Sequence, residues 1–192
     1  MTILIINDID DLHWRNGSGN ADLVIACGDI SDSLILEAAD AFNTTKIFAV
    51  KGNHDPATVF PKPIIDLHLH IENNGGVSFG GFNGSWKYKP RGHFLYEQEE
   101  ASRMLAGFPR VDIFVSHNSP KGVHDKQDDI HFGFEALKSY IEHQKPRLFI
   151  HGHQHVNRET VIGETCVMGV YGHKIIELDQ RNPFLRIATD NT

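Results

Sequence analysis

The most constraining feature of this chain is a series of short polar segments, each of which directly follows a hydrophobic run. The hydrophobic runs have the length and composition of buried strands. Each polar segment would therefore lie at the carboxyl end of a strand, where open α/β sheets gather their functional sites. The segments are Asp8–Asp10, Gly28–Asp32, Gly52–Asp55, His117 and Gly152–His155. One such segment would be a weak indication, but the whole series predicts a single site.

The first third of the chain alternates between predicted strands and a predicted helix. Strands are expected at Thr2–Asn7, Leu23–Cys27 and Lys46–Val50. Between the last two, apolar residues recur at helical spacing over Leu34–Phe42, and Asp32 or Ser33 would cap that helix. Strand, helix and strand in this order indicate a parallel sheet with right-handed crossovers.

The rest of the chain adds further strands and two helices. Ile65–Ile71 alternates apolar and polar residues and predicts a half-buried strand, which the turn Asn73–Gly76 would join to Val77–Phe82 as a hairpin. The remaining elements are helices at Gln98–Phe108 and Phe132–Gln144, and strands at Val111–Ser116, Arg147–Ile150, Glu159–Val161, Thr165–Val170 and Lys174–Leu178. This pattern predicts an α/β fold: a four-layer α/β/β/α sandwich of two mixed sheets with helices on the outer faces.

Length and composition narrow the class of protein. A chain of 192 residues fits one domain, residues 1–192, with a full hydrophobic core. Its net charge of −7 disfavours an extended nucleic-acid partner, because such binding depends on basic residues that neutralise phosphates. The apolar runs are too short to span a bilayer. Two cysteines, Cys27 and Cys166, lie in apolar segments and are interpreted as reduced core thiols, which favours the cytoplasm.

The polar segments resemble the signature of the calcineurin-like metallophosphoesterases, which reads D-x-H, G-D-x-x-D, G-N-H-D/E, H and G-H-x-H. The resemblance implies two divalent metal ions bridged by Asp29. The first ion would also be held by Asp8, Asp10 and His155, and the second by Asn53, His117 and His153. The fold that the resemblance implies is the sandwich already predicted from the order of the elements.

The same resemblance implies the reaction. A hydroxide that bridges the two ions would attack phosphorus in line, as in other two-metal sites. His54 would meet the substrate phosphate and protonate the leaving oxygen, and Asp32 would orient His54 through a hydrogen bond. A carboxylate partner of this kind favours the protonated acid form of the imidazole.

Asp10 departs from the signature, because the family normally has histidine at that position. Two alignments are open: Asp8-Ile9-Asp10 as the first motif, or Asp11-Leu12-His13, which matches D-x-H literally. The predicted strand ends at Asn7, which favours the first alignment. A carboxylate in place of an imidazole makes the first site harder and more anionic, so Mn²⁺ is the favoured metal, with Mg²⁺, Fe or Zn²⁺ as alternatives.

Two further segments are candidate substrate contacts. Asn118–Asp125 resembles the H-x-P-P-x-G-x-x-D segment of a branch that includes diesterases acting on nucleotides, with Ser119 in place of the first proline. Its candidate residues are Lys121, His124 and Asp125. Gly84–His93 combines aromatic and basic groups, which could stack a base and neutralise phosphate. Its candidates are Trp86, Lys87 and Arg91. The 118–125 segment can equally be read as an ordinary solvated loop. For the 84–93 segment the functional reading is favoured over a surface loop, because it follows a predicted strand of the same sheet system.

Together these observations predict a dinuclear metal-dependent phosphodiesterase that acts on nucleotide or other small-molecule phosphodiesters. The alternatives are a phosphomonoester phosphatase and a binding scaffold with a weakened metal site. The expected partner is a small phosphoester substrate, with no membrane, and a homo-oligomer is possible.

Overall fold

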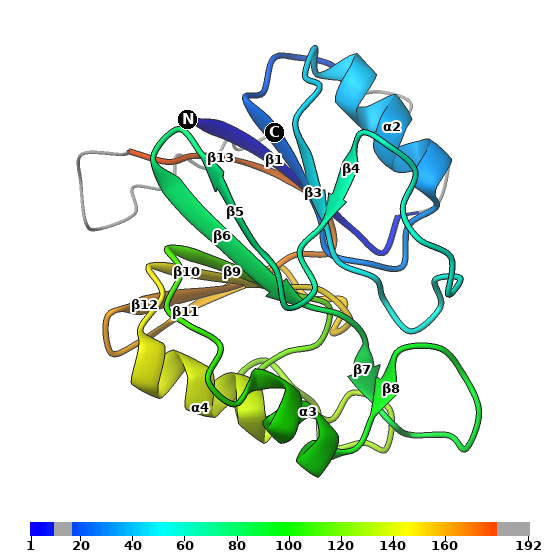
Figure 1. Cartoon of the computed structure of the whole chain (residues 1–192), viewed down its shortest axis with the longest axis vertical. Coiled ribbons are helices and arrows are strands. Elements are labelled where there is room, and N and C mark those ends of the chain that lie inside the picture. The colour runs from blue at the N-terminus through cyan, green and yellow to red at the C-terminus, as the bar shows by residue number, and fades with distance from the viewer. Residues whose placement is uncertain (10–16, 180–192) are drawn as a thin grey trace.

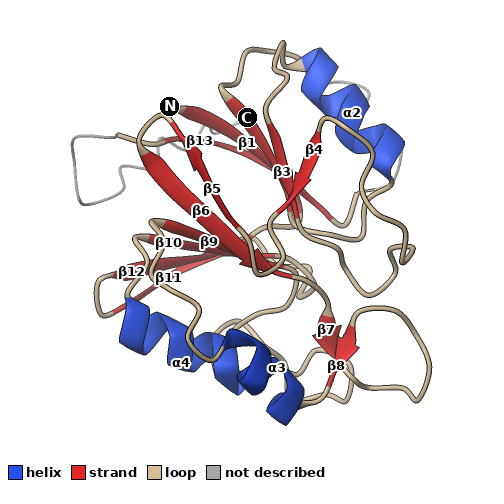
Figure 2. Ribbon diagram, in the orientation of Figure 1, coloured by secondary structure: helices blue, strands red, loops and turns tan. Residues whose placement is uncertain are grey.

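Two mixed β-sheets pack face to face in the computed structural model, which describes residues 1–9 and 17–179 (Figures 1 and 2). Helix α2 covers the outer face of one sheet, and α3 and α4 cover the outer face of the other. The four-layer α/β/β/α arrangement expected from the sequence is therefore confirmed.

The first sheet has the strand order β13-β1-β2-β3-β4. Strands β1 to β4 run parallel, and β13 pairs with β1 in the antiparallel direction. The bounds are β1 Thr2–Asn7, β2 Leu23–Ala26, β3 Ile47–Ala49, β4 Ile64–Asp66 and β13 Gly172–Glu177. The central strands are apolar on both faces, as parallel strands covered on both sides require.

The second sheet has the order β11-β12-β10-β9-β6-β5, with parallel pairing in its centre and antiparallel pairs at both edges. The bounds are β5 Ile71–Asn74, β6 Val77–Phe82, β9 Ile113–Ser116, β10 Leu148–His151, β11 Arg158–Ile162 and β12 Thr165–Gly169. A short parallel pair, β7 Ser85–Trp86 with β8 Leu95–Tyr96, lies beyond the end of β6.

Alternating side chains of each strand build separate cores. Ile3 and Ile5 point between the sheets, whereas Leu4 and Ile6 point toward α2. Phe114 and Phe149 on the second sheet pack under α3 and α4. The period of two in each strand thus produces one inter-sheet core and two cores beneath helices.

The helices begin and end somewhat differently from the sequence-based expectation. Helix α2 spans Asp32–Ala41, and its N-cap is Ser31, whose hydroxyl accepts a hydrogen bond from the Leu34 N–H at 3.3 Å. The predicted cap at Asp32 or Ser33 is therefore wrong by one or two positions. Helix α3 covers Gln98–Leu105 and α4 covers Glu135–Gln144. Of the helices in the described part of the chain, none is long and apolar enough to cross a bilayer.

The predicted strand Ile65–Ile71 is in fact two strands in different sheets. β4 pairs with β3 of the first sheet, and β5 pairs with β6 of the second. The chain turns between them at Leu69, whose φ is +53°. Leu67 is buried in the inter-sheet core, so this crossing segment keeps the alternation that made it look like one strand. The hairpin itself is confirmed, with its turn at Gly75 and Gly76 and with β5 as the partner of β6.

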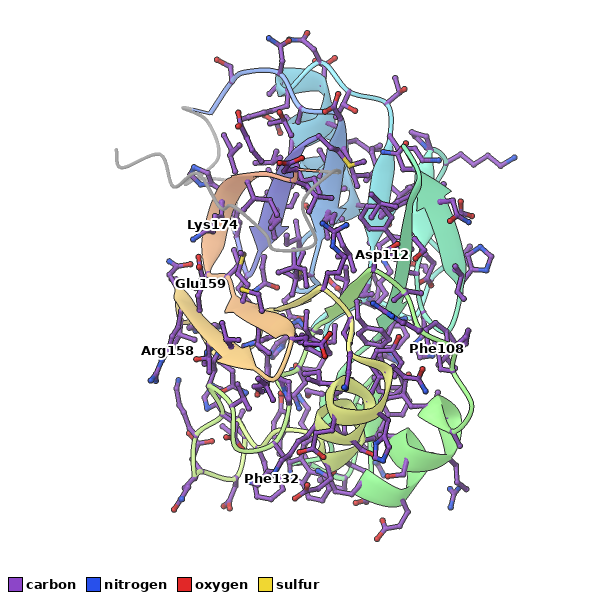
Figure 3. The ribbon with its side chains drawn as sticks, turned by 90° about the vertical axis from the view of Figure 1, so that its left-hand side faces the viewer. Phe108, Asp112, Phe132, Arg158, Glu159 and Lys174 are labelled. Carbon is purple, nitrogen blue, oxygen red and sulfur yellow. The ribbon has the colours of Figure 1, made fainter. Side chains whose placement is uncertain are left out.

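The two sheets are also joined along one edge. Lys174 on β13 and Glu159 on β11 form an ion pair of 2.8 Å between the outer strands of the two sheets (Figure 3). With the sheets packed in this way, the carboxyl ends of β1, β2 and β3 meet those of β9 and β10, and the polar segments of the sequence lie there.

Candidate metal centre

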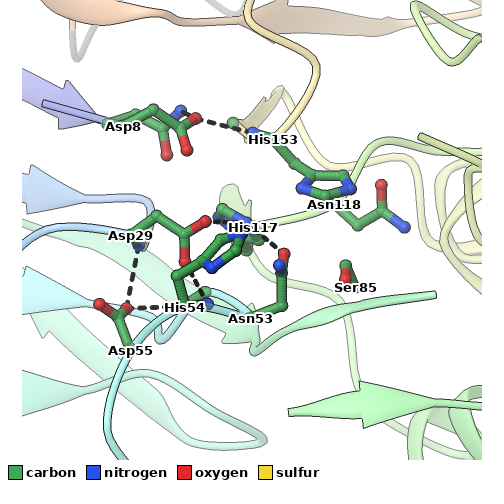
Figure 4. A network of polar contacts seen from close by, with 12 residues as sticks. Asp8, Asp29, Asn53, His54, Asp55, Ser85, His117, Asn118 and His153 are labelled. Atoms are coloured by element: carbon green, nitrogen blue, oxygen red, sulfur yellow. Dashed lines mark hydrogen bonds and ion pairs between the residues drawn. The ribbon is translucent and has the colours of Figure 1, made fainter. Parts of the chain in front are cut away.

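Five strands of the two sheets deliver polar side chains to one place (Figure 4). The side chains and the strands that they follow are Asp8 after β1, Asp29 after β2, Asn53 after β3, His117 after β9 and His153 after β10. The sequence predicted this convergence from strand ends alone.

The tightest part of the site is formed by Asp29, His117 and His153, whose donor atoms lie within 4.8 Å of one another. Within residues 1–9 and 17–179, this is the one group of His, Cys, Asp and Glu donors that meets this spacing. Asn53 belongs beside it, because its Oδ1 lies 3.1 Å from Nε2 of His117. One carboxylate, two imidazoles and an amide oxygen form a donor set that suits a first-row divalent ion.

Both imidazoles are oriented by backbone carbonyls. The Nδ1–H of His117 donates to the Cys27 carbonyl at 2.8 Å, and the Nε2–H of His153 donates to the Ile130 carbonyl at 3.1 Å. Each bond fixes a tautomer that leaves the other ring nitrogen for the centre. Metal-ligating histidines typically donate their other ring N–H to an acceptor of this kind.

Asp29 and His117 form a buried pair in which each side chain shifts the pKa of the other. Burial alone would lower the pKa of His117, but the carboxylate of Asp29 raises it to about 9. Burial would likewise raise the pKa of Asp29, and the His117 cation lowers it to about 2. A proton on Nε2 of His117 thus lies next to Asp29 Oδ2, at 3.4 Å, and Asn53 Oδ1.

His153 and Asp8 respond in the opposite sense. Burial, reinforced by the nearby His117 cation, lowers the pKa of His153 to about 3, so this imidazole is neutral and able to bind a metal. Burial also raises the pKa of Asp8. The Asp8 carboxylate accepts a hydrogen bond from the backbone N–H of His153 at 3.0 Å, and His155 Nε2 lies 3.6 Å from Asp8 Oδ1.

The turns that carry Asp29 and Asn53 are closely packed against each other. A Cβ on Gly52 would collide with Asp29 Oδ1, so glycine here makes space for that carboxylate. Asp55 ties the two turns together, because its carboxylate accepts hydrogen bonds from the backbone N–H groups of Asp29 at 3.0 Å and Gly52 at 2.7 Å.

A solvent-facing hollow of about 380 Å³ opens over the centre. This volume lies within the range of small-molecule sites. Its lining contains predicted metal ligands, His54, and aromatic and aliphatic side chains. The lining residues are Asp8, Ile9, Asp29, His54, Ile130, His131, His153, His155 and Tyr171.

His54 lies at this hollow, but Asp32 does not orient it as predicted. The backbone N–H of His54 donates to Asp29 Oδ1 at 2.8 Å, which ties the backbone of His54 to the Asp29 carboxylate. Asp32 instead accepts a hydrogen bond from the Lys51 ammonium at 3.0 Å. The side chain of Lys51 is almost fully buried, and an ammonium in such a place requires a charged partner. The predicted Asp32–His54 contact is therefore wrong.

The predicted substrate residues of the 118–125 segment contact one another and neighbouring side chains. Lys121 pairs with Asp125 at 3.0 Å and lies over the Phe132 ring. Thr160 donates to Nε2 of His124, and Nδ1–H of His124 donates to Nε2 of buried His151, both at 2.9 Å. All three candidates thus lie outside the residues that line the hollow, and their roles remain predictions.

The candidates of the 84–93 segment also lie outside that lining. The Trp86 ring packs against Phe132 with centroids 5.8 Å apart, Lys87 pairs with Glu97 at 3.2 Å, and Arg91 is exposed. The Trp86 contact joins this segment to the loop that follows His117. Asp10 and the alternative His13 lie outside the described residues, so the choice between the two alignments of the first motif stays open.

Three residues near the centre were missed by sequence reasoning. The Tyr88 hydroxyl accepts a hydrogen bond from Nδ2 of Asn53 at 3.2 Å, and Gln154 holds the loop after His117. The third, His131, lines the hollow. Its spacing from Asp128 was an available signal, since an acid three residues before a histidine permits a local pair. Nothing in the sequence marked Tyr88 or the direction of the Gln154 side chain.

Comparisons with known proteins agree with this fold and indicate a family. Residues 1–173 match the model of the calcineurin-like phosphoesterase superfamily domain, and the chain belongs to this family. A probable metallophosphoesterase of Methanocaldococcus jannaschii is 31% identical over 110 residues, which are 57% of this chain and 50% of that protein. The matched region thus spans half the length of this curated relative.

Two solved structures show the same fold. The protein TT1561 of Thermus thermophilus is similar with a TM-score of 0.62 at 16% identity, covering 98% of each chain. The phosphopantetheinyl hydrolase of Mycobacterium tuberculosis is similar with a TM-score of 0.58 at 14% identity, covering 89% of each chain.

Proposed function

We propose that this protein is a dinuclear metal-dependent phosphodiesterase that hydrolyses nucleotide or other small-molecule phosphodiesters. The observation that carries the proposal is the convergence of Asp29, His117 and His153 within 4.8 Å beneath an open hollow. Membership of the calcineurin-like phosphoesterase family supports a phosphoester substrate. The preference for diesters is supported by the resemblance of the segment after His117 to that of nucleotide diesterases.

In this proposal, two sets of ligands lie on opposite sides of Asp29. Asn53, His117 and His153 would hold one divalent ion, and Asp8, His155 and Asp10 the other, with Asp29 shared. Two such ions supply an activated water nucleophile and neutralise the charge on the transferring phosphoryl group.

The chain's own residues position the substrate and assist the leaving group. His54 lines the hollow and its backbone is tied to Asp29, so the imidazole would lie near the phosphorus of a bound ester and could protonate the departing alcohol. The hollow accommodates a small ester, and the net charge of −7 disfavours a long nucleic-acid strand.

A substrate panel with metal-stripped protein tests the proposal. The protein is reloaded with Mn²⁺ or Zn²⁺ and assayed with bis-p-nitrophenyl phosphate, p-nitrophenyl phosphate, cyclic nucleotides and single-stranded DNA. We expect Mn²⁺ to restore more activity than Zn²⁺, because carboxylates dominate the side of Asp8, and diesters to be cleaved faster than the monoester. Asp66→Asn changes an exposed aspartate at the end of β4 and is the matched control for Asp29→Asn. It should keep the metal content and the activity of the unaltered protein.

Each other outcome has a distinct meaning. Faster cleavage of the monoester would make the protein a phosphomonoester phosphatase. Failure to retain Mn, Fe or Zn after reloading would indicate that the protein is a binding scaffold and not an enzyme. Rapid cleavage of single-stranded DNA would indicate a nuclease and would overturn the small-substrate assignment.

A further inference from the structure

Ile130 and His131, which line part of the hollow, belong to a loop segment, residues 130–132, whose backbone is held by hydrogen bonds. Its three successive carbonyl groups accept hydrogen bonds from side chains of the centre or of its flanking residues. The donors are Nε2 of His153 to Ile130 at 3.1 Å, Nε2 of Gln154 to His131 at 3.0 Å and Nδ2 of Asn118 to Phe132 at 2.9 Å. The backbone on this side is therefore fixed relative to the metal ligands.

The side chain of His131 is fixed as well. Asp128 accepts hydrogen bonds from both the backbone N–H of His131, at 2.6 Å, and its Nδ1–H, at 2.8 Å. These two bonds, first the backbone and then the imidazole, lower the pKa of Asp128 to about 2, so the carboxylate is charged at neutral pH. With Nδ1 committed to Asp128, Nε2 is the nitrogen that His131 can offer to a ligand.

The ring of His131 lies close to the predicted ligands without joining them. Its centroid is 5.3 Å from that of His153 and 6.3 Å from that of His155. The compact group of donor atoms contains Asp29, His117 and His153 and excludes His131. His131 lines the hollow next to the predicted metal ligands, so its side chain can contact a substrate that is bound to the ions.

From this geometry we infer that His131 contacts the phosphoryl group of the bound substrate through Nε2, and that Asp128 is a positioning residue for it. The inference rests on the proposed function of the same site. An imidazole that carries a proton on each ring nitrogen can donate one N–H to a carboxylate and the other to a phosphoryl oxygen, and such charge-assisted bonds are the strong ones. The arrangement gives the hollow a second histidine outside the predicted ligand set, besides His54, and the loop after His117 supplies it.

The test compares His131→Ala with the unaltered protein, both loaded with Mn²⁺. Inorganic phosphate is the probe, titrated calorimetrically, and the metal content is measured on the same samples. We expect phosphate affinity to fall about tenfold and KM for the diester to rise by a similar factor, with two ions retained. Asp128→Asn should produce a smaller loss of the same kind, because the imidazole remains but is no longer held.

His70→Ala is the matched control. His70 and Glu72 form an exposed imidazole–carboxylate pair with a separation of 3.0 Å, outside the residues that line the hollow. Phosphate affinity should be unchanged in this variant. Thermal unfolding of all variants is recorded, and His131→Gln, which keeps a hydrogen-bonding amide, replaces His131→Ala if the latter unfolds.

The outcomes separate this inference from the proposed function. If the unaltered protein binds metal but neither binds phosphate nor cleaves any ester, the proposed function is wrong. If it is active and His131→Ala binds phosphate equally well, the inference alone is wrong. Loss of an ion from His131→Ala would also overturn it, because His131 would then be a metal ligand.

Discussion

The two halves of the proposed metal centre are built differently. His117 and His153 are 0% and 5% exposed, and each is oriented by a backbone carbonyl. On the other side, the His155 side chain is 53% exposed and reaches Asp8 at 3.6 Å. The donors of the first half are thus buried and held by hydrogen bonds, whereas His155 of the second half lies at the rim of the hollow.

This contrast has a physical cause and a functional consequence. The His117 and His153 rings are buried and held by backbone carbonyls, whereas His155 is half exposed, and ligand sets that are already in place bind an ion with less reorganisation. We therefore expect the half with His117 to bind its ion more tightly than the half with His155.

The largest effect should come from removing the residue common to both halves. Asp29→Asn should lower turnover by about a thousandfold or more, roughly 4 kcal/mol, because neither ion keeps its bridging carboxylate.

His155→Asn should instead cost one ion per chain and leave the buried half loaded. Metal analysis after dialysis distinguishes the two variants. Loss of both ions from His155→Asn would contradict the independence of the halves.

A smaller effect should appear in the pH dependence of the metal-free protein. The pKa of His117 is raised from 6.5 to about 9 by Asp29 against the opposing effect of burial. A raised folded-state pKa gives stability that is complete below pH 6.5 and is lost as pH rises through about 9. The free energy of unfolding should fall by at most about 3 kcal/mol over that window. Urea unfolding at several pH values measures it.

Added Mn²⁺ should change this pH response. An ion at the buried half displaces the proton of His117, so binding should strengthen with rising pH in the same window. A metal-free protein whose stability is constant between pH 6.5 and about 9 would show that His117 carries no extra proton.

The smallest effect concerns the orientation of Asn53. Tyr88→Phe removes the hydroxyl that accepts from Nδ2 of Asn53 and should weaken the tighter metal site about tenfold, as loss of other groups that orient metal ligands does. Titration of metal-free protein with Mn²⁺ measures this. Tyr96→Phe, in the neighbouring strand β8, is the control. Equal affinity in both variants would show that the Asn53 amide needs no support.

The sequence predicted the fold and the buried half of the centre well, because both follow from strand ends. Hydrophobic runs locate β1, β2, β3, β9 and β10, and the residue after each run is then placed by topology. The Ile65–Ile71 prediction failed because alternation reports which side a residue faces and does not report which sheet it joins.

The misassigned and missed side chains depend on tertiary packing. Asp32 was assigned to His54 from the family resemblance, and nothing in the sequence shows that Lys51 is buried and requires a carboxylate. Tyr88 reaches Asn53 only because β7 and β8 bring that loop back to the centre. His131 lies after a long irregular segment whose path is set by hydrogen bonds from Gln154 and Asn118.

Gln154 gives the centre a property that matters for protein engineering. Its amide donates to Asn118 at 3.2 Å, Ser119 at 2.9 Å and the His131 carbonyl at 3.0 Å, although it lies between the two histidines of the G-H-x-H segment. The loop that would set substrate choice is therefore not a separable module. A chimaera that grafts this loop onto another member of the family must carry the matching residue at position 154.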